Sequence, residues 1–132
     1  MIRYFISSFC LLVISSISLA AGDKWVEKAD MMTAIDSLST SVVNGKIYAI
    51  GGWTGGMDAN AKFTKTVGEY DPIKNIWTKK ADMPTARGAS TCVVDGKIYA
   101  IGGYGNGVVA VPSIEVYDPA TDKWTKKDDM PT

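Results

Sequence analysis

The chain has 132 residues, of which 46% are hydrophobic and 21% charged, a composition typical of a folded globular protein. Its 14 basic residues balance its 14 acidic ones, which argues against nucleic-acid binding, because that function needs an excess of Lys and Arg to neutralise phosphates. The sequence contains no His, which excludes histidine-based nucleophilic sites and histidine-ligated zinc or copper within it. We therefore expect no catalytic residue, metal site or cofactor in this chain.

The first twenty residues have the three parts of a secretory signal peptide. Arg3 supplies a positive start, an apolar run follows, and the small residues Ser18 and Ala20 precede a cleavage site after Ala20. The alternatives are an uncleaved anchor or a buried helix, but the run is shorter than the roughly 20 residues that span a bilayer and is interrupted by Ser. We predict a signal peptide over residues 1–20 and a secreted or periplasmic mature protein with no membrane attachment.

Cleavage would also remove Cys10 and leave Cys92 without a partner for an internal disulfide. Cys92 lies in the segment STCVV, which predicts a strand. An unpaired Cys usually behaves as a small hydrophobic residue, so we expect Cys92 to lie in the core.

An internal repeat organises the rest of the chain. The segments WVEKADM, WTKKADM and WTKKDDM recur with their Trp residues 52 and then 47 positions apart. Between them VVNGKIYAIGG returns as VVDGKIYAIGG. A period of about 50 residues is typical of propeller blades. The predicted divisions are a linker with a lone outer strand (21–32), a first repeat (33–80), a second repeat (81–128) and the start of a further repeat (129–132).

Each repeat predicts four strands. Asn44-Gly45 and Asp95-Gly96 each separate two apolar runs by two residues, as a type I′ hairpin turn requires. The second strand is a nearly continuous apolar run, which favours burial on both faces. Pro72 and Pro119 end the third strand because proline cannot donate to a ladder. The fourth strand contains the repeated Trp.

The hairpin, the double glycine, the Tyr-Asp-Pro and the Trp seven residues after that Tyr together resemble the kelch repeat. The resemblance implies an all-β fold built from four-stranded antiparallel blades of a kelch β-propeller, with about two blades present and the ring incomplete. The positions that match the family's motif are Gly51, Gly52, Tyr70, Trp77, Gly102, Gly103, Tyr117 and Trp124.

These motif residues have structural roles in our interpretation. The Gly pairs permit a sharp strand exit and close approach of a neighbouring backbone, and the Tyr and Trp rings pack between blades. Asp71 and Asp118 precede Pro and organise turns rather than act as acids. The Lys pairs at 79–80 and 126–127 form a solvated edge that discourages pairing with another sheet.

A meander places its tight turns on one face and its longer, variable loops on the other. Binding residues favour loops held by a rigid scaffold, so the loop face is the predicted binding site. Arg87 matches the kelch arginine, whereas Ile35 stands at that place in the first repeat. For Arg87 both structural hydrogen bonding to a neighbouring blade and ligand contact remain open. The candidate ligand contacts are Trp53, Tyr104, Arg87, Asp58 and Asn60.

Two blades cannot close a ring, because known propellers have about four to eight. We expect either part of a longer propeller or short chains that assemble, and an isolated chain that is poorly stable or oligomeric.

The favoured function is a protein- or glycan-binding module that acts through the loop face. The alternative, implied by exported kelch enzymes, is part of a sugar-processing enzyme, epimerase-like or oxidase-like. A passive adhesion or spacer module fits the same residues. Nucleic acid is not an expected partner.

We predict that export removes residues 1–20. The protein recovered from the periplasm or medium should begin at Ala21, because the small residues before that position suit signal peptidase. N-terminal sequencing or intact mass measures this directly. Recovery of the uncleaved chain in the membrane fraction would instead establish an anchor.

Overall fold

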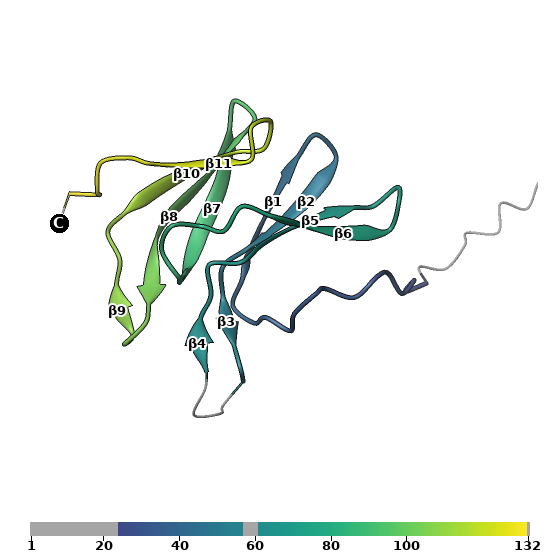
Figure 1. Cartoon of the computed structure of the whole chain (residues 1–132), viewed down its shortest axis with the longest axis horizontal. Helices are drawn as coiled ribbons and strands as arrows, with labels where there is room; N and C mark the ends of the chain where they lie inside the picture. The colour runs from purple at the N-terminus through teal and green to yellow at the C-terminus, as the bar shows by residue number, and fades with distance from the viewer. Residues whose placement is uncertain (1–23, 57–60, 132) are drawn as a thin grey trace, which may run out of the picture.

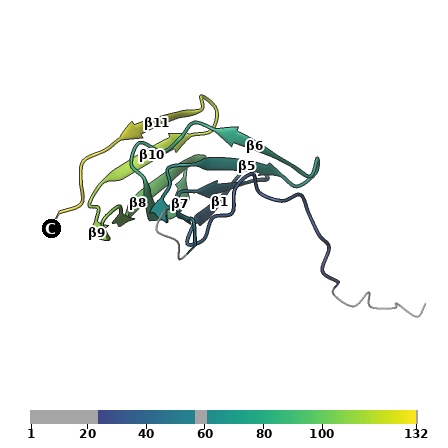
Figure 2. The ribbon, with the colours of Figure 1, turned by 60° about the horizontal axis from the view of Figure 1, so that its bottom comes forward.

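A computed structural model describes residues 24–56 and 61–131. The predicted signal peptide, Cys10, Asp58 and Asn60 lie outside the described residues. Within them the chain is all β and its main sheets are antiparallel. Two four-stranded meanders lie side by side and splay like a fan, as Figures 1 and 2 show.

The first meander, blade 1, has the strand order β1-β2-β5-β6. The second, blade 2, has the order β7-β8-β10-β11, with the short β9 added to the end of β8. A separate hairpin, β3–β4, extends from blade 1. The strands are β1 (Ser39–Val43), β2 (Lys46–Ile50), β3 (Trp53–Thr54), β4 (Lys62–Phe63), β5 (Val67–Asp71), β6 (Ile76–Lys80), β7 (Arg87–Val94), β8 (Lys97–Gly105), β9 (Val109–Ala110), β10 (Ile114–Asp118) and β11 (Lys123–Lys126).

The predicted turns are confirmed. Asn44 and Asp95 have φ of 51° and 49°, and each is followed by a glycine with positive φ, as a type I′ turn requires. Asp71 Oδ1 accepts hydrogen bonds from the backbone N–H of Ile73 and Lys74, both at 3.0 Å. Asp118 Oδ1 accepts one from Ala120 at 3.0 Å. Both aspartates therefore organise turns, as expected.

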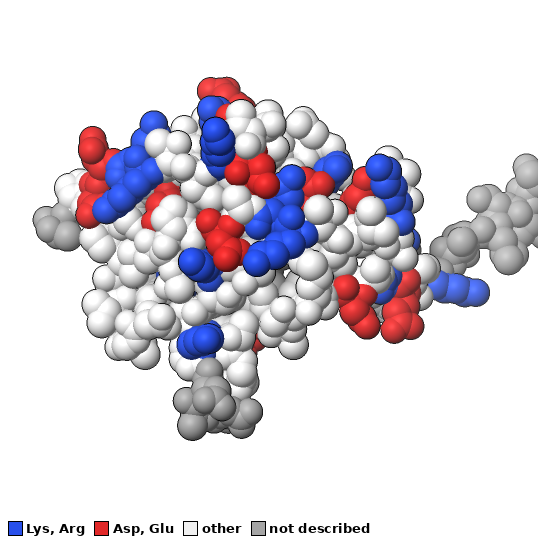
Figure 3. Space-filling model, viewed as in Figure 1, with Lys and Arg blue, Asp and Glu red and all other residues white. Residues whose placement is uncertain are grey.

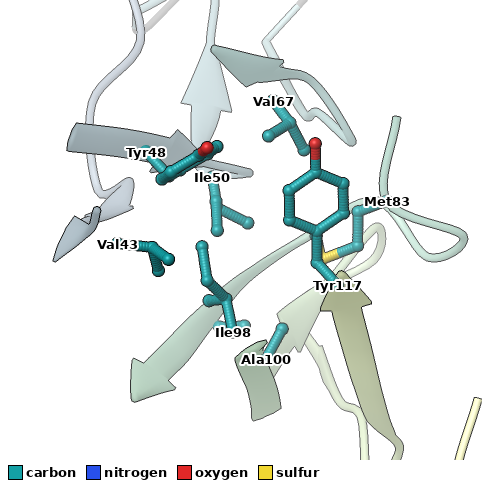
Figure 4. Packing of buried hydrophobic residues seen from close by; sticks show 9 residues of the cluster. Val43, Tyr48, Ile50, Val67, Met83, Ile98, Ala100 and Tyr117 are labelled. Carbon is teal, nitrogen blue, oxygen red and sulfur yellow. The ribbon is translucent and has the colours of Figure 1, made fainter. Parts of the chain in front are cut away.

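The hydrophobic core lies between the two blades. Blade 1 contributes Tyr48, Ile50 and Val67, and blade 2 contributes Ile98 and Tyr117, all buried. Figure 4 shows these side chains converging from the two sheets. The rings of Tyr48 and Tyr117 lie 5.9 Å apart at 59°, a tilted geometry that adds about 0.5–1.5 kcal/mol to the gain from burial. Fully buried Met83, from the segment that joins the blades, completes the cluster.

One carboxylate is buried beside this core. Glu69 accepts hydrogen bonds from the Tyr48 hydroxyl at 2.6 Å and from Lys46 Nζ at 2.8 Å. Burial pushes the pKa of Glu69 up, but these two hydrogen bonds and the positive charges of Lys46 and Lys80 together hold the pKa below its usual value. Glu69 therefore stays charged, and its buried oxygens are satisfied by blade 1 itself.

The repeated Trp fastens the segment that leads into its own blade. Trp77 Nε1 donates to the Ala29 carbonyl and Trp124 Nε1 to the Ala81 carbonyl, both at 2.9 Å. Each Trp also packs on the Tyr of the neighbouring strand, with ring centroids 5.0 Å apart at Tyr70 and 5.1 Å apart at Tyr117. Tyr117 lies between the blades as predicted, whereas Tyr70 lies on the opposite face of blade 1 from blade 2.

Cys92 is exposed, so the prediction that it lies in the core is wrong. Cys92 pairs with Tyr99, and side chains alternate along a strand, so both project from the face of blade 2 that points away from blade 1. Ile98 and Ala100, one position to either side of Tyr99, are the residues that enter the core. The local sequence has the same apolar character on both faces, which is why it did not reveal this.

The Gly51-Gly52 pair ends β2 against blade 2. Gly51 has φ of +61°, and a Cβ there would overlap the Arg87 carbonyl oxygen of blade 2. Gly52 N–H donates to that same carbonyl at 3.0 Å. The predicted close approach is therefore a contact between blades.

We predict that Gly51→Ala destabilises the fold by about 3 kcal/mol or more, because the new methyl group forces the blades apart. Gly45→Ala is the matched control: Gly45 has a similar φ of +74° but nothing within 4 Å of an added Cβ. It should lose about 1 kcal/mol through backbone conformation alone. Urea unfolding followed by Trp fluorescence measures both, and equal losses would contradict the close-contact explanation.

Candidate functional site

The long loops gather at one end of the molecule, which we call the loop end. Figure 1 shows the β3–β4 hairpin and β9 there, and the β1–β2 and β7–β8 turns at the opposite end. This is the arrangement that a meander predicts. Two rigid sheets therefore carry their variable connections on one side, where both repeats contribute to a single surface.

Trp53 belongs to the base of the β3–β4 hairpin. Its backbone pairs with Asp36 through two hydrogen bonds of 2.9 and 2.8 Å. Its ring packs edge-on against Phe63 at 4.8 Å and 78°, and its indole N–H donates to the Gly56 carbonyl at 2.9 Å. Trp53 is half-buried, so one part of the ring orders the hairpin. A cleft beside it is lined by Thr33, Asp36 and Gly55, among others.

The corresponding loop of blade 2 presents apolar side chains to solvent. Tyr104, Val108 and Val109 are 55%, 71% and 62% exposed. Val108 has φ of 57°, a rare conformation for a β-branched residue, because its branched side chain crowds the backbone. Strained backbone of this kind concentrates at functional sites. Figure 3 shows an uncharged area over β9 and the adjoining part of β8.

Contacts between the two blades hold these loops together. Asn106 Oδ1, in the blade 2 loop, accepts a hydrogen bond from the Phe63 backbone N–H at 3.1 Å. Next to it, Arg87 N–H donates to the Thr64 carbonyl at 3.3 Å. The hairpin of blade 1 and the loop of blade 2 therefore form one continuous surface.

The Arg87 side chain is fully buried, behind the loop end. Its guanidinium donates to Ser113 Oγ and to the Ala100 carbonyl, the latter at 3.0 Å, and lies 3.3 Å from Glu115 Oε2. Burial lowers the pKa of Arg87, and the charge of Glu115 offsets part of that shift. These groups all belong to blade 2. The expected hydrogen bonding to the neighbouring blade is therefore made by the Arg87 backbone. The Arg87 side chain bonds within its own blade and is not exposed for the predicted ligand contact.

The charged partner of Arg87 is Glu115, which is not among the residues predicted from the sequence. Glu115 is 1% exposed and also accepts a hydrogen bond from the Thr85 hydroxyl at 2.6 Å. A signal was present: where the second repeat has Arg87 and Glu115, the first has Ile35 and Gly68. Both charges are lost together, as expected of an ion pair whose members are costly to bury singly.

In residues 24–56 and 61–131, side chains of His, Cys, Asp and Glu form no cluster of three suited to a metal ion. The same residues include no helix of the length and apolarity needed to cross a membrane. The candidate contacts Asp58 and Asn60 lie outside the described residues, so their role in ligand binding stays a prediction.

Comparison with known proteins identifies the family. The family model described as "Kelch motif" matches residues 37–84 and 85–131. The chain belongs to the kelch-motif family. Kelch-like ECH-associated protein 1B of Danio rerio is 36% identical over 80 residues, which is 60% of this chain and 14% of that protein.

Two further relatives bear on fold and function. N-acetylneuraminate epimerase of Pasteurella multocida is 39% identical over 64 residues, 46% of this kelch chain and 17% of the enzyme. The solved structure of YjhT superposes with a TM-score of 0.75 at 19% identity and covers 86% of this chain. The chain spans 44% of YjhT. The fold is thus that of a partial kelch β-propeller.

We predict that Arg87 and Glu115 act as a structural pair. Glu115→Ala should cost about 3–5 kcal/mol, because it leaves a buried guanidinium without its counter-charge. The double variant Arg87→Met with Glu115→Ala should lose clearly less than the sum of the single losses in denaturant unfolding. Lys79→Met, which breaks the exposed pair with Asp82 at 3.6 Å, is the control and should change stability by less than about 1 kcal/mol. Additive losses at Arg87 and Glu115 would refute the pairing.

Proposed function

We propose that this chain is an exported kelch-propeller segment that binds a protein partner through its loop end. The observation that carries the proposal is the exposed apolar surface of Tyr104, Val108 and Val109 on a loop fixed between two blades. The relative from Danio rerio is named for its association with ECH, which supports a protein as the partner. The signal-like residues 1–20 support a secreted or periplasmic location.

The physical argument concerns the entropy of binding. Aromatic and β-branched side chains give large contact areas and have few rotamers to lose when a partner covers them. The loop is already ordered by β9 pairing with β8 and by the hydrogen bond from Phe63 to Asn106. A partner therefore gains apolar burial without the cost of ordering a flexible segment.

A glycan is the second candidate ligand, favoured by the cleft beside Trp53. An indole face packs on the apolar face of a sugar ring, and the polar residues Thr33 and Asp36, which also line this cleft, suit sugar hydroxyls. The local similarity to N-acetylneuraminate epimerase supports a sugar ligand. An enzymatic role within a larger sugar-processing protein follows only if sugar binding is found.

We predict that a loop-end variant loses protein recognition. Peptides that bind the exported wild-type chain are first selected from a displayed random library. These peptides should bind the double variant Tyr104→Ala with Val109→Ser at least about 10-fold more weakly than the wild type, because apolar anchors dominate such contacts. Ile73→Ala is the matched control, since Ile73 is 95% exposed in the β5–β6 turn at the opposite end. Unchanged affinity in the loop-end variant would refute the proposal.

A glycan array that includes N-acetylneuraminate separates the two candidates. Under the protein-binding proposal the chain selects peptides and gives no glycan signal. Glycan binding that is lost in Trp53→Ala but kept in the Tyr104 and Val109 variant would replace the protein partner with a sugar.

A further inference from the structure

The segment that joins the two blades is fastened at its first residue by side chains of blade 2. This segment, residues 81–86, runs from the end of β6 to the start of β7, and we call it the strap. The N–H of Ala81 donates to Asp122 Oδ1, and the carbonyl of Ala81 accepts from Trp124 Nε1, both at 2.9 Å. Asp122 Oδ1 also accepts from the Tyr117 hydroxyl at 2.7 Å. Asp122, Tyr117 and Trp124 form what we call the strap clasp.

Blade 1 contains the same clasp with a neutral group at its centre. Asn75 Oδ1 accepts from the Ala29 N–H at 2.9 Å and from the Tyr70 hydroxyl at 2.7 Å, and Trp77 Nε1 donates to the Ala29 carbonyl at 2.9 Å. Asn75 and Asp122 also share the same backbone conformation, with φ of 56° and 54°. The two clasps therefore match in geometry and differ at one position, where blade 1 has an amide and blade 2 a carboxylate.

The charged and titratable groups around Asp122 come from both blades. Tyr117 belongs to blade 2, whereas Lys80 and Tyr48 interact with the Asp122 charge from blade 1. Glu69 lies behind them, 2.6 Å from the Tyr48 hydroxyl and 3.9 Å from Lys80 Nζ. The strap N–H, the Tyr117 hydroxyl and the charge of Lys80 hold the pKa of Asp122 below its usual value, although desolvation acts in the opposite direction.

Protons reach Asp122 while the protein is folded, because this residue is exposed. Asn75 is exposed as well, although a following blade lies beside blade 1. The exposure is therefore a property of this turn in either repeat. Asp82, the second residue of the strap, lies 3.6 Å from Lys79 Nζ, so it has a cation of its own.

Protonation changes only one of the two clasps. A carboxylate accepts charge-assisted hydrogen bonds that are roughly twice as strong as those to a neutral acceptor. Protonated Asp122 loses that advantage and its attraction to Lys80, whereas the Asn75 amide does not titrate. Since folding lowers the pKa of Asp122, the charged clasp is complete above about pH 4 and is lost as the pH falls through the folded-state pKa.

We propose that the strap clasp is an acid-sensitive latch, in which protonation of Asp122 releases the Ala81 end of the strap while the Asn75 clasp keeps its hold on Ala29. The other end of the strap leads into Arg87, whose carbonyl accepts the Gly52 N–H of blade 1 at 3.0 Å. No carboxylate takes part in that bond. Acid therefore opens the strap locally and leaves the contact between the blades closed.

Backbone amide NMR of the exported chain between about pH 6 and about pH 2.5 tests the latch. The Ala81 amide proton should shift in one transition, and its hydrogen-exchange protection, corrected for the intrinsic rate, should fall at least about 5-fold, because the acceptor becomes neutral. Ala29 is the internal control and should keep its protection. Gly52 should also keep its protection, and an equal loss there would indicate general acid unfolding and overturn the local latch.

Variants that exchange the two clasps identify the titrating group. Asp122→Asn should abolish the Ala81 transition, and this variant should fold because blade 1 already uses Asn at the equivalent position. Asn75→Asp should create a matching acid transition at Ala29. Asp82→Asn is the control for a nearby carboxylate and should leave the Ala81 transition unchanged. A transition that persists in Asp122→Asn, or that disappears in Asp82→Asn, would overturn the proposal.

Discussion

The contact between the two blades is the constraint on which the rest of the structure depends. Each sheet is a half-buried surface that gains stability only when another sheet covers it. Tyr48 and Tyr117 meet across this junction, and Gly51 lets the backbone of blade 1 approach the Arg87 carbonyl. Without the glycine the sheets would stand further apart and the side chains between them would lose contact. Both repeats contain the large Tyr and Trp rings together with the Gly pair. The rings fill the space between the sheets, and the glycines let the sheets come close enough for the rings to pack.

The position of the loop end follows from this contact. The hairpin of blade 1 and the loop of blade 2 are joined by the hydrogen bond from Phe63 to Asn106, which forms because the sheets already hold their connections side by side. The strained φ of Val108 is tolerated for the same reason, since β9 and β8 anchor the chain on either side of it. A surface suited to binding therefore arises where two similar sheets carry two loops that differ from each other in length and sequence.

The buried ion pair shows how one fold accepts two solutions at equivalent places. Blade 2 buries Arg87 against Glu115, with Ser113 and Thr85 satisfying further atoms of the pair. Blade 1 has Ile35 and Gly68 instead and needs none of these partners. Apolar residues at these places avoid the cost of removing charges from water. A buried charged pair is stable only when both members and their hydrogen bonds are present. Blade 2 therefore buries a charged pair at positions where blade 1 needs no charged group.

The sequence by itself determined the strands, the turns and the family. The Asn-Gly and Asp-Gly turns, the prolines after Asp71 and Asp118, and the copied Trp segments act over a few residues, so local chemistry specifies them. Which face of each strand is covered was decided only by the tertiary structure. Cys92 and Ile98 look alike in sequence, yet Ile98 is buried and Cys92 is exposed. The hydrogen bonds from Arg87 to Ser113 and from Phe63 to Asn106 join residues 26 and 43 positions apart, and no local pattern predicted them. Such contacts depend on how two twisted sheets pack, and no local pattern encodes that geometry.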